Sequence, residues 1–368
     1  MNLKEKFSWM PAEDLEKGMY EEAAKEGTSF GQWLENKKFA SGVETPYANM
    51  TQAQAIALRA NLRAQGKSVP MNAVEELMQA YDIKMFGGYN DPVQKFYQYS
   101  GSTVLFPEYI AQKVYAGALK PSLVPALVAE DTVIDAINFH KVYISDTEPQ
   151  RQMSKVGIGD EIPGVRITVS KESIAMQKFG KALEVAYEEV KYVPLNLFGL
   201  TLDRIGAQMG MDESDDLVYT LINGDGNSNT PGTTVTSDST GTIGIADAIE
   251  FAICLPTPYK MTDFVVKKAI LNKYLVSLLG VSLDNPPGTL QSIGVPLPKW
   301  HEWDRTVVTS DRMYGIDKAY AIGRVSTGAV VTETDKIINK QLNRTVVSYR
   351  SGFHIIDKNA VAIFDETH

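Results

Sequence analysis

The chain has 368 residues, a net charge of −9 and an ordinary hydrophobic content of 44%, as in globular proteins. A chain of this length can form two or three domains and bury about 75% of the surface that its unfolded form exposes. The negative charge argues against a dedicated nucleic-acid-binding surface, which would be basic, but not against a protein that merely lies near nucleic acid. No segment has the ~20 apolar residues that a membrane-spanning helix needs.

Residue types that commonly carry catalysis are few and dispersed. Cys254 is the single cysteine, so the chain can form neither an internal disulfide nor a thiolate metal cluster. Its apolar neighbours favour a buried hydrophobe over a nucleophile. No two histidines share a helix face at metal-ligand spacing; the four are His140, His301, His354 and His368. The first residues lack the apolar core of a secretion signal, which predicts folding in a cytoplasm.

The sequence pattern of residues 1–84 predicts a series of short helices. Thr51 fits the N-cap of one helix and Gly66 its end. The next helix is expected to begin near Ser68 and Pro70. Its apolar residues at helical spacing are Met71, Val74, Leu77, Met78 and Tyr81. We expect a small helical arm or domain that packs on another surface.

The next two segments change from helix to strand. Residues 85–138 are expected to be extended and then helical, with Pro107 at the start of the helix. Residues 139–187 predict a long β-hairpin, because apolar and polar residues alternate on both sides of the polar stretch 146–160. A two-stranded hairpin is marginal in water by itself, so this one is expected to lie on a partner chain.

Residues 188–226 predict one long helix and the turn that ends it. Pro194 suits the first helical position. Gly206 and Gly210 would let a neighbouring backbone approach the helix closely. A helix that continues to Asn223 would measure about 43 Å, which is longer than a small domain needs. Its narrow apolar stripe consists of Phe198, Leu202, Ile205 and Met209.

The remainder of the chain predicts a mixed α/β domain at residues 227–342 and two final strands at residues 343–368. A polar surface loop is expected at 227–242. Further helices are expected near 246–251 and 270–279. Further strands are expected near 264–266, 306–308 and 319–322.

One incomplete motif lies where the long helix ends. Asn223, Asp225 and Asn227 have the first three spacings of a calcium-binding loop. Ser228 stands where that loop needs a glycine, and Thr234 where it needs a bidentate glutamate. The pattern therefore favours a turn that terminates the helix.

Other candidate chemistry is also incomplete. Residues 301–305 begin like a zinc-protease motif and lack its second histidine. The acidic run 212–216 favours a solvated helix face or an intersubunit contact over a metal site. We therefore predict no catalytic, cofactor-binding or metal-binding residues. If the chain were an enzyme, the best candidates would be His301 with Asp304, or His354 with Asp357.

The order of these elements resembles the major capsid proteins of tailed bacteriophages, which have the HK97-like fold. The resemblance covers about residues 100–366. It rests on the hairpin of 139–187, the helix of 194–223 and the turn 221–226, which Pro231-Gly232 follows. Three later segments resemble the family's return from an axial to a peripheral domain; they are 314–320, 344–355 and 360–364.

The resemblance implies an α+β shell subunit with a division of labour. A peripheral domain would hold residues 188–226, which contain the spine helix, and the return strands 343–368. An axial domain at 227–342 would meet its copies at five-fold and six-fold centres. The hairpin would extend over a neighbouring subunit, and residues 85–138 would form an N-arm and the first peripheral segment. Residues 1–84 would be a retained arm that adds contacts between subunits.

The function implied is structural, without catalysis and without a cofactor. The chain would self-assemble into hexamers and pentamers of an icosahedral head, in the bacterial host cytoplasm, and would be located in the virion capsid. Its partners would be its own copies, a portal protein and scaffold or decoration proteins. Double-stranded DNA would lie inside without sequence-specific contact, and no membrane would take part.

The sequence leaves three other possibilities open. Lys155 would form isopeptide cross-links with Asn339 or Asn343 if the shell were covalently joined, as in one member of the family. An encapsulin-type compartment would have the same fold and enclose an enzyme. A soluble α/β enzyme would carry a site of dispersed residues.

Overall fold

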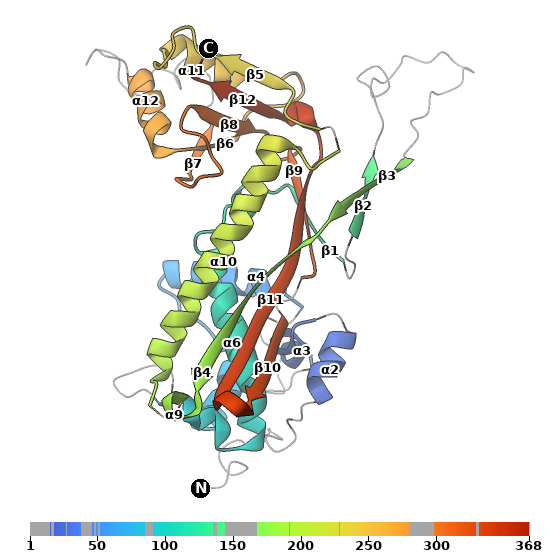
Figure 1. Ribbon diagram of the computed structural model, residues 1–368, viewed down its shortest axis with the longest axis vertical. Helices are drawn as coiled ribbons and strands as arrows, with labels where there is room; N and C mark the ends of the chain where they lie inside the picture. Colours follow the sequence, from blue (N-terminus) through green and yellow to red (C-terminus); the bar gives the residue numbers. More distant parts are fainter. Residues whose placement is uncertain are drawn as a thin grey trace. The chain divides into compact units, whose positions relative to one another are not determined.

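The computed structural model describes residues 15, 18–26, 28–37, 46–47, 49–50, 52–84, 91–134, 138–143, 168–190, 192–227, 229–279, 298–328 and 331–367. The chain divides into two compact units, each built from three segments (Figure 1). Unit 1 comprises Met1–Leu123, Lys178–Ser214 and Thr327–Arg350. Unit 2 comprises Val124–Gln177, Asp215–Ser326 and Ser351–His368.

Unit 1 is mainly helical. Its helices are α2 (Gly18–Lys25), α3 (Phe30–Asn36), α4 (Gln52–Ala64), α5 (Ala73–Ala80), η2 (Val93–Tyr97), α6 (Ser100–Leu119), α9 (Tyr187–Val190), the first part of α10 (Leu195–Asn223) and η3 (Ile338–Lys340). Its strands are β4 (Gln177–Ala186), β10 (Val331–Ile337) and the first part of β11 (Leu342–Ile355). Within this unit β11 lies between β10 and β4.

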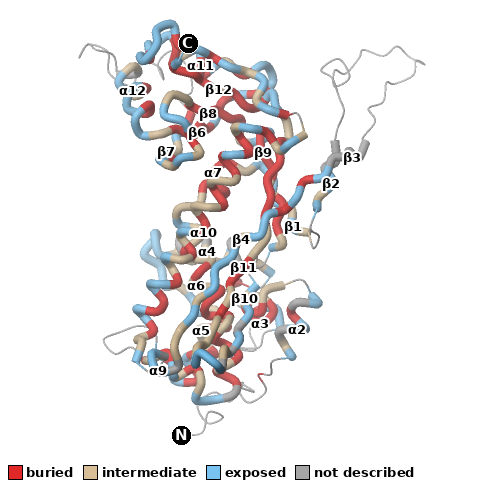
Figure 2. The backbone as a smooth tube through the Cα atoms, in the orientation of Figure 1, coloured by how far each residue is buried: buried red, intermediate tan, exposed pale blue. Residues whose placement is uncertain are grey.

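Helices α2, α3 and α5, which precede residue 84, contribute to the core of unit 1. Leu34 of α3 and Leu77 of α5 are fully buried in the same apolar cluster as Ile110 of α6 and Leu202 of α10. Buried segments of these helices appear in red in Figure 2. The N-terminal helices therefore pack on their own unit, because their apolar faces complete the core that α6 and α10 begin.

Unit 2 contains most of the strands. Its helices are α7 (Val124–Leu127), α11 (Ile245–Ile253), α12 (Lys268–Leu279), η4 (Lys358–Ala360) and the last part of α10. Its strands are β1 (Glu130–Val133), β2 (Asn138–Tyr143), β3 (Thr168–Ala175), β5 (Thr233–Thr236), β6 (Asp263–Val266), β7 (Lys299–Glu302), β8 (Arg312–Ile316), β9 (Ile322–Ser326), the last part of β11 and β12 (Val361–Asp365).

The principal sheet of unit 2 has the strand order β5-β12-β8-β6-β7. Strand β12 is parallel to β5 and antiparallel to β8, and β6 is parallel to β7. The core of this sheet is aromatic. Phe251 of α11 lies edge-on to Phe264 of β6 and to Phe364 of β12, with ring centroids 6.0 and 5.6 Å apart. Tyr274 of α12 packs against Phe264, so both helices cover the sheet through aromatic side chains.

Several sequence-based expectations are confirmed. The long helix runs without a break from Leu195 to Asn223, through both of its central glycines. The helices α11 and α12 and the buried strand β6 lie where the periodicity placed them. Strand β2 pairs with β3 in antiparallel register, as expected for a hairpin, whereas the residues between Tyr143 and Thr168 lie outside the described part of the chain.

Other expectations differ from the structure. Pro107 lies inside α6, which begins seven residues earlier because the Ser102 and Thr103 hydroxyls bond to the carbonyl of Phe96 and hold the first turn. The helix expected from Ser68 begins at Ala73, because Asn72 and Glu75 form a reciprocal capping box there. The segment 306–308 forms turns, and strand β9 begins only at the end of the segment expected at 319–322.

Two strand assignments also change. The residues after Ala175 leave the hairpin, because β4 pairs with β11. The expected pair of return strands is divided between the sheets. The first part of β11 pairs with β10, whereas β12 lies in the principal sheet of unit 2 between β5 and β8. Local alternation identified these strands, but it carries no information on the partner strand.

Candidate assembly elements

The spine helix α10 contacts α6 through a seam of glycines, which we define as Gly117, Gly206 and Gly210. A Cβ atom on Gly206 would lie 2.0 Å from the carbonyl oxygen of Val114, and one on Gly210 would lie 2.0 Å from that of Ala118. A Cβ atom on Gly117 would lie 2.3 Å from the carbonyl oxygen of Asp203. The two helix backbones are therefore in direct contact, and no side chain larger than hydrogen fits between them.

The turn that ends the spine helix is fastened to strand β11. Gly224 and Gly226 have φ angles of +78° and +87°, which glycine adopts without strain. The Asp225 carboxylate accepts hydrogen bonds from the backbone N–H of Asn227 at 3.2 Å and from that of Ile355 at 3.1 Å. These two hydrogen bonds fix the turn to the chain at Asn227 and to strand β11 at Ile355.

The acidic run at the middle of the helix is divided among separate roles. Asp212 accepts a hydrogen bond from Gln208, and Glu213 is buried. Asp215 accepts one from Trp303 Nε1 at 2.8 Å and one from Arg305 Nε at 2.6 Å. We call these last three residues the polar clamp. It joins the end of the helix to the segment after β7, and no group of acidic or histidine side chains able to hold a metal occurs within the described residues.

The hairpin of β2 and β3 forms a sheet of two strands, within the part of the chain that is described. Its base lies against β11. The Phe139 ring packs on His354 with centroids 5.5 Å apart, and Ala175 at the end of β3 approaches Gly352. Lys155, the cross-link candidate, lies outside the described residues, whereas Asn339 is exposed and Asn343 is half-buried.

The histidine–aspartate pairs suggested for an enzyme are not brought together. His301 Nε2 lies 2.9 Å from Asp263 Oδ1, and Asp304 is exposed. His354 packs on Phe139, whereas Asp357 accepts a hydrogen bond from the Tyr259 hydroxyl. Cys254 is partly buried, and burial raises the pKa of its thiol to about 11, so the reactive thiolate is disfavoured.

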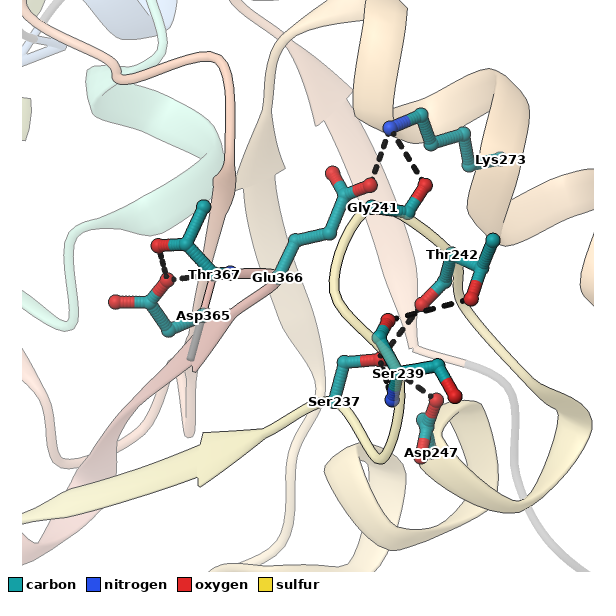
Figure 3. A network of polar contacts seen from close by, with 9 residues as sticks. All are labelled: Ser237, Ser239, Gly241, Thr242, Asp247, Lys273, Asp365, Glu366 and Thr367. Carbon is teal, nitrogen blue, oxygen red and sulfur yellow. Dashed lines mark hydrogen bonds and ion pairs between the residues drawn. The ribbon is translucent and has the colours of Figure 1, made fainter.

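A polar network fastens the last strand of unit 2 (Figure 3). Lys273 of α12 forms an ion pair with the buried Glu366 and donates a hydrogen bond to the Gly241 carbonyl oxygen at 3.1 Å. Ser237 Oγ donates to the carbonyl oxygen of Thr242 at 2.6 Å and lies 3.1 Å from Asp247 Oδ2. These contacts join the loop 237–244 and the end of β12 to both helices, which is a structural role.

No protein-family model matches the sequence, and no curated protein is similar to it. Its fold does match a solved structure. The capsid of the native GTA particle superposes with a TM-score of 0.50 at 11% identity, over 67% of this chain and 90% of that one. The chain has the HK97-like capsid fold.

Two further solved structures give slightly lower TM-scores. A virus-like particle from Pyrococcus furiosus gives 0.49 at 14% identity, over 70% of this chain and 98% of that one. The SrpI encapsulin complex from Synechococcus elongatus gives 0.47 at 11% identity, over 67% and 88%. At 11% identity the likeness to the GTA capsid establishes the fold alone, and function has to be argued from the residues.

The sequence did not lead to a prediction of two features of this fold. The partner of the central glycines is the α6 segment from Val114 to Ala118, whose small residues Ala116, Gly117 and Ala118 were a usable signal for close helix packing. The polar clamp joins residues 88 and 90 positions apart, and no local pattern reports such a contact.

Proposed function

We propose that this chain is a major capsid protein that self-assembles into the hexamers and pentamers of an icosahedral phage head enclosing double-stranded DNA. The capsid fold supports a role in shell formation. The observation that carries the proposal is the two-stranded hairpin of β2 and β3. A two-stranded sheet is marginally stable at best in water, so its strands need a surface beyond its base, and a neighbouring subunit would supply one.

The division into two units supports separate roles in a shell. Unit 1 would be the peripheral domain, in which the N-terminal helices, α6 and the first part of the spine share one core. The principal sheet of unit 2 would be the axial domain that meets its copies at the symmetry centres. This assignment moves β12 from the peripheral to the axial domain, since β12 lies inside that sheet.

The proposed particle would form in the bacterial host cytoplasm and persist as the virion capsid. Self-contacts would be its main interactions, with a portal protein and scaffold or decoration proteins as further partners. The net charge of −9 supports a wall that repels packaged DNA and does not bind it by sequence. Among the described residues, no helix combines the length and apolar character needed to cross a membrane.

Electron microscopy of the purified full-length protein tests the proposal. We expect closed shells of uniform diameter from the protein alone or with its neighbouring phage genes, and nuclease-protected double-stranded DNA in particles from infected cells. Shells that enclose an enzyme and no DNA would identify an encapsulin-type compartment. A protein that stays monomeric at high concentration under all assembly conditions would contradict the proposal.

A deletion separates folding from assembly. Removal of residues 146–163, which lie between the hairpin strands, should leave a folded subunit that does not form shells. Circular dichroism would check folding, and sedimentation velocity would check assembly. The control is a chain in which four Gly/Ser residues replace the exposed residues 65–68, which lie outside the hairpin. Normal shells from the deletion variant would show that the hairpin is not an intersubunit contact.

A further inference from the structure

Unit 1 buries a carboxyl group that the proposed shell function does not use. Glu108 lies in the middle of α6 and is only 4% exposed. Its carboxyl group accepts a hydrogen bond from Gln112 Nε2 at 3.1 Å and one from the backbone N–H of Gly31. Helix α3 therefore lies directly over this carboxyl group, and part of the cover is backbone.

Gly31 is the residue that permits this close approach. A Cβ atom at this position would lie 2.4 Å from Glu108 Oε1 and 2.7 Å from Gln112 Nε2. Gln112 continues the contact to α5, because its Oε1 atom accepts a hydrogen bond from Asn72 Nδ2 at 3.1 Å. The same polar group thus contacts both N-terminal helices that share the core of unit 1.

The charged groups on the surrounding elements do not neutralise Glu108. Glu35 of α3 accepts a hydrogen bond from the backbone N–H of Ala73, and Glu75 of α5 is paired with Arg59. Glu76 of α5 is another carboxyl group, and Lys113 lies near Tyr109 on α6 itself. No ion pair to Glu108 occurs within the described residues, so burial raises its pKa to about 7.

We propose that the docking of α3 onto α6 is linked to the protonation of Glu108. The neutral carboxyl group fits beneath the Gly31 backbone, whereas the ionised group is buried without a cation and favours a state in which α3 has moved away. The N-terminal helices would then be a cover whose attachment weakens as pH rises.

The direction of this pH dependence follows from the pKa of Glu108 in the docked and undocked states. In the undocked state Glu108 is exposed and releases its proton near its ordinary pKa of 4.5, whereas in the docked state it does so near 7. The free energy of docking therefore does not depend on pH below about pH 4.5. Docking weakens as pH rises from there to about 7, and it does not weaken further above that range.

Hydrogen exchange on the full-length protein tests the proposal. The protection factors of the α3 amides, corrected for intrinsic exchange rates, are compared at pH 5.5 and 8.5. From the two pKa values we expect protection to fall by about 30-fold. Amides of β12 in unit 2 are the internal reference and should keep their protection factors.

Two variants sharpen the test. Glu108→Gln keeps the shape of the neutral carboxyl group and should make the α3 protection nearly independent of pH. Glu188→Gln, at an exposed position, should retain the wild-type dependence. Wild-type α3 protection that does not change with pH would overturn the proposal, and so would a Glu108→Gln variant that shows the full wild-type loss. Both readouts are made on unassembled subunits, so they are independent of whether the chain forms a shell.

Discussion

The two ends of the spine helix are held in different ways. Its first part, in unit 1, contacts α6 through the backbone at the glycine seam, and its Leu202 and Met209 side chains are buried in the apolar cluster that includes α6. Its last part, in unit 2, is held by hydrogen bonds to the carboxylates of Asp215 and Asp225. One continuous helix therefore combines a close-packed contact with a polar, directional one.

The two kinds of contact differ in how well they tolerate amino-acid substitutions. A backbone-to-backbone seam has no rotamers with which to adapt, so an added methyl group forces the helices apart. A hydrogen-bonded contact between side chains can rearrange or admit water, so a lost partner costs less. We therefore expect the seam to be the more sensitive half.

The largest loss of unfolding free energy is expected from a substitution at the glycine seam. Gly206→Ala would place a Cβ atom against the Val114 carbonyl, and we expect a loss of about 3 kcal/mol or more in unfolding free energy. Urea unfolding followed by far-UV circular dichroism measures it. Gly18→Ala at the start of α2 is the control, since its new methyl group would meet no atom within 4 Å. Equal unfolding free energies of the two variants would contradict direct contact between the helix backbones at the seam.

The polar clamp should give a smaller effect. Asp215→Ala removes the acceptor for Trp303 Nε1 and Arg305 Nε, and we expect a loss of about 2 kcal/mol. Tryptophan fluorescence during urea unfolding reports this loss and the changed surroundings of Trp303. Arg204→Ala, at an exposed position of the same helix, should stay within about 0.5 kcal/mol of the wild type. A clamp variant as stable as that control would show that the clamp adds no stability.

A still smaller effect is expected at the helix-terminating turn. Asp225→Asn keeps an acceptor oxygen for the Ile355 N–H and removes its charge, so we expect a loss of about 1 kcal/mol. Amide exchange at Ile355 measures the local change. Protection at Ile355 that equals the wild-type value would mean that the carboxylate charge does not contribute to this joint.

The smallest effect is a pH dependence in unit 2. Burial acts to raise the pKa of Asp365, but hydrogen bonds from Thr367 and Arg312 outweigh it and leave the pKa below its ordinary value of 3.8. A depressed pKa stabilises the fold above the ordinary value, and the stabilisation is lost as pH falls through the lowered one. Thermal unfolding between pH 5 and 2.5 should therefore show a smaller decline for Asp365→Asn than for the wild type. Identical declines would exclude this contribution.

The sequence predicted features that depend on local pattern. The glycine turn after Asn223 and the uninterrupted helix before it follow from spacing and residue type. The polar clamp, the internal place of β12 between β5 and β8, and the buried Glu108 were not predicted. Each depends on a partner far along the chain, as Asp215 does on Trp303. Alternation and capping fix the form of a segment, but tertiary packing decides which neighbour it meets.

The position of β12 has a consequence for the synthesis of the chain. This strand lies inside the principal sheet, between β5 and β8, although it is the last strand of the sequence. A nascent chain that has not yet emerged as far as residue 365 lacks an internal strand of unit 2, and the edges of β5 and β8 stay open. Completion of that sheet therefore follows translation of residue 365, and a nascent chain that has not reached this residue lacks the finished sheet.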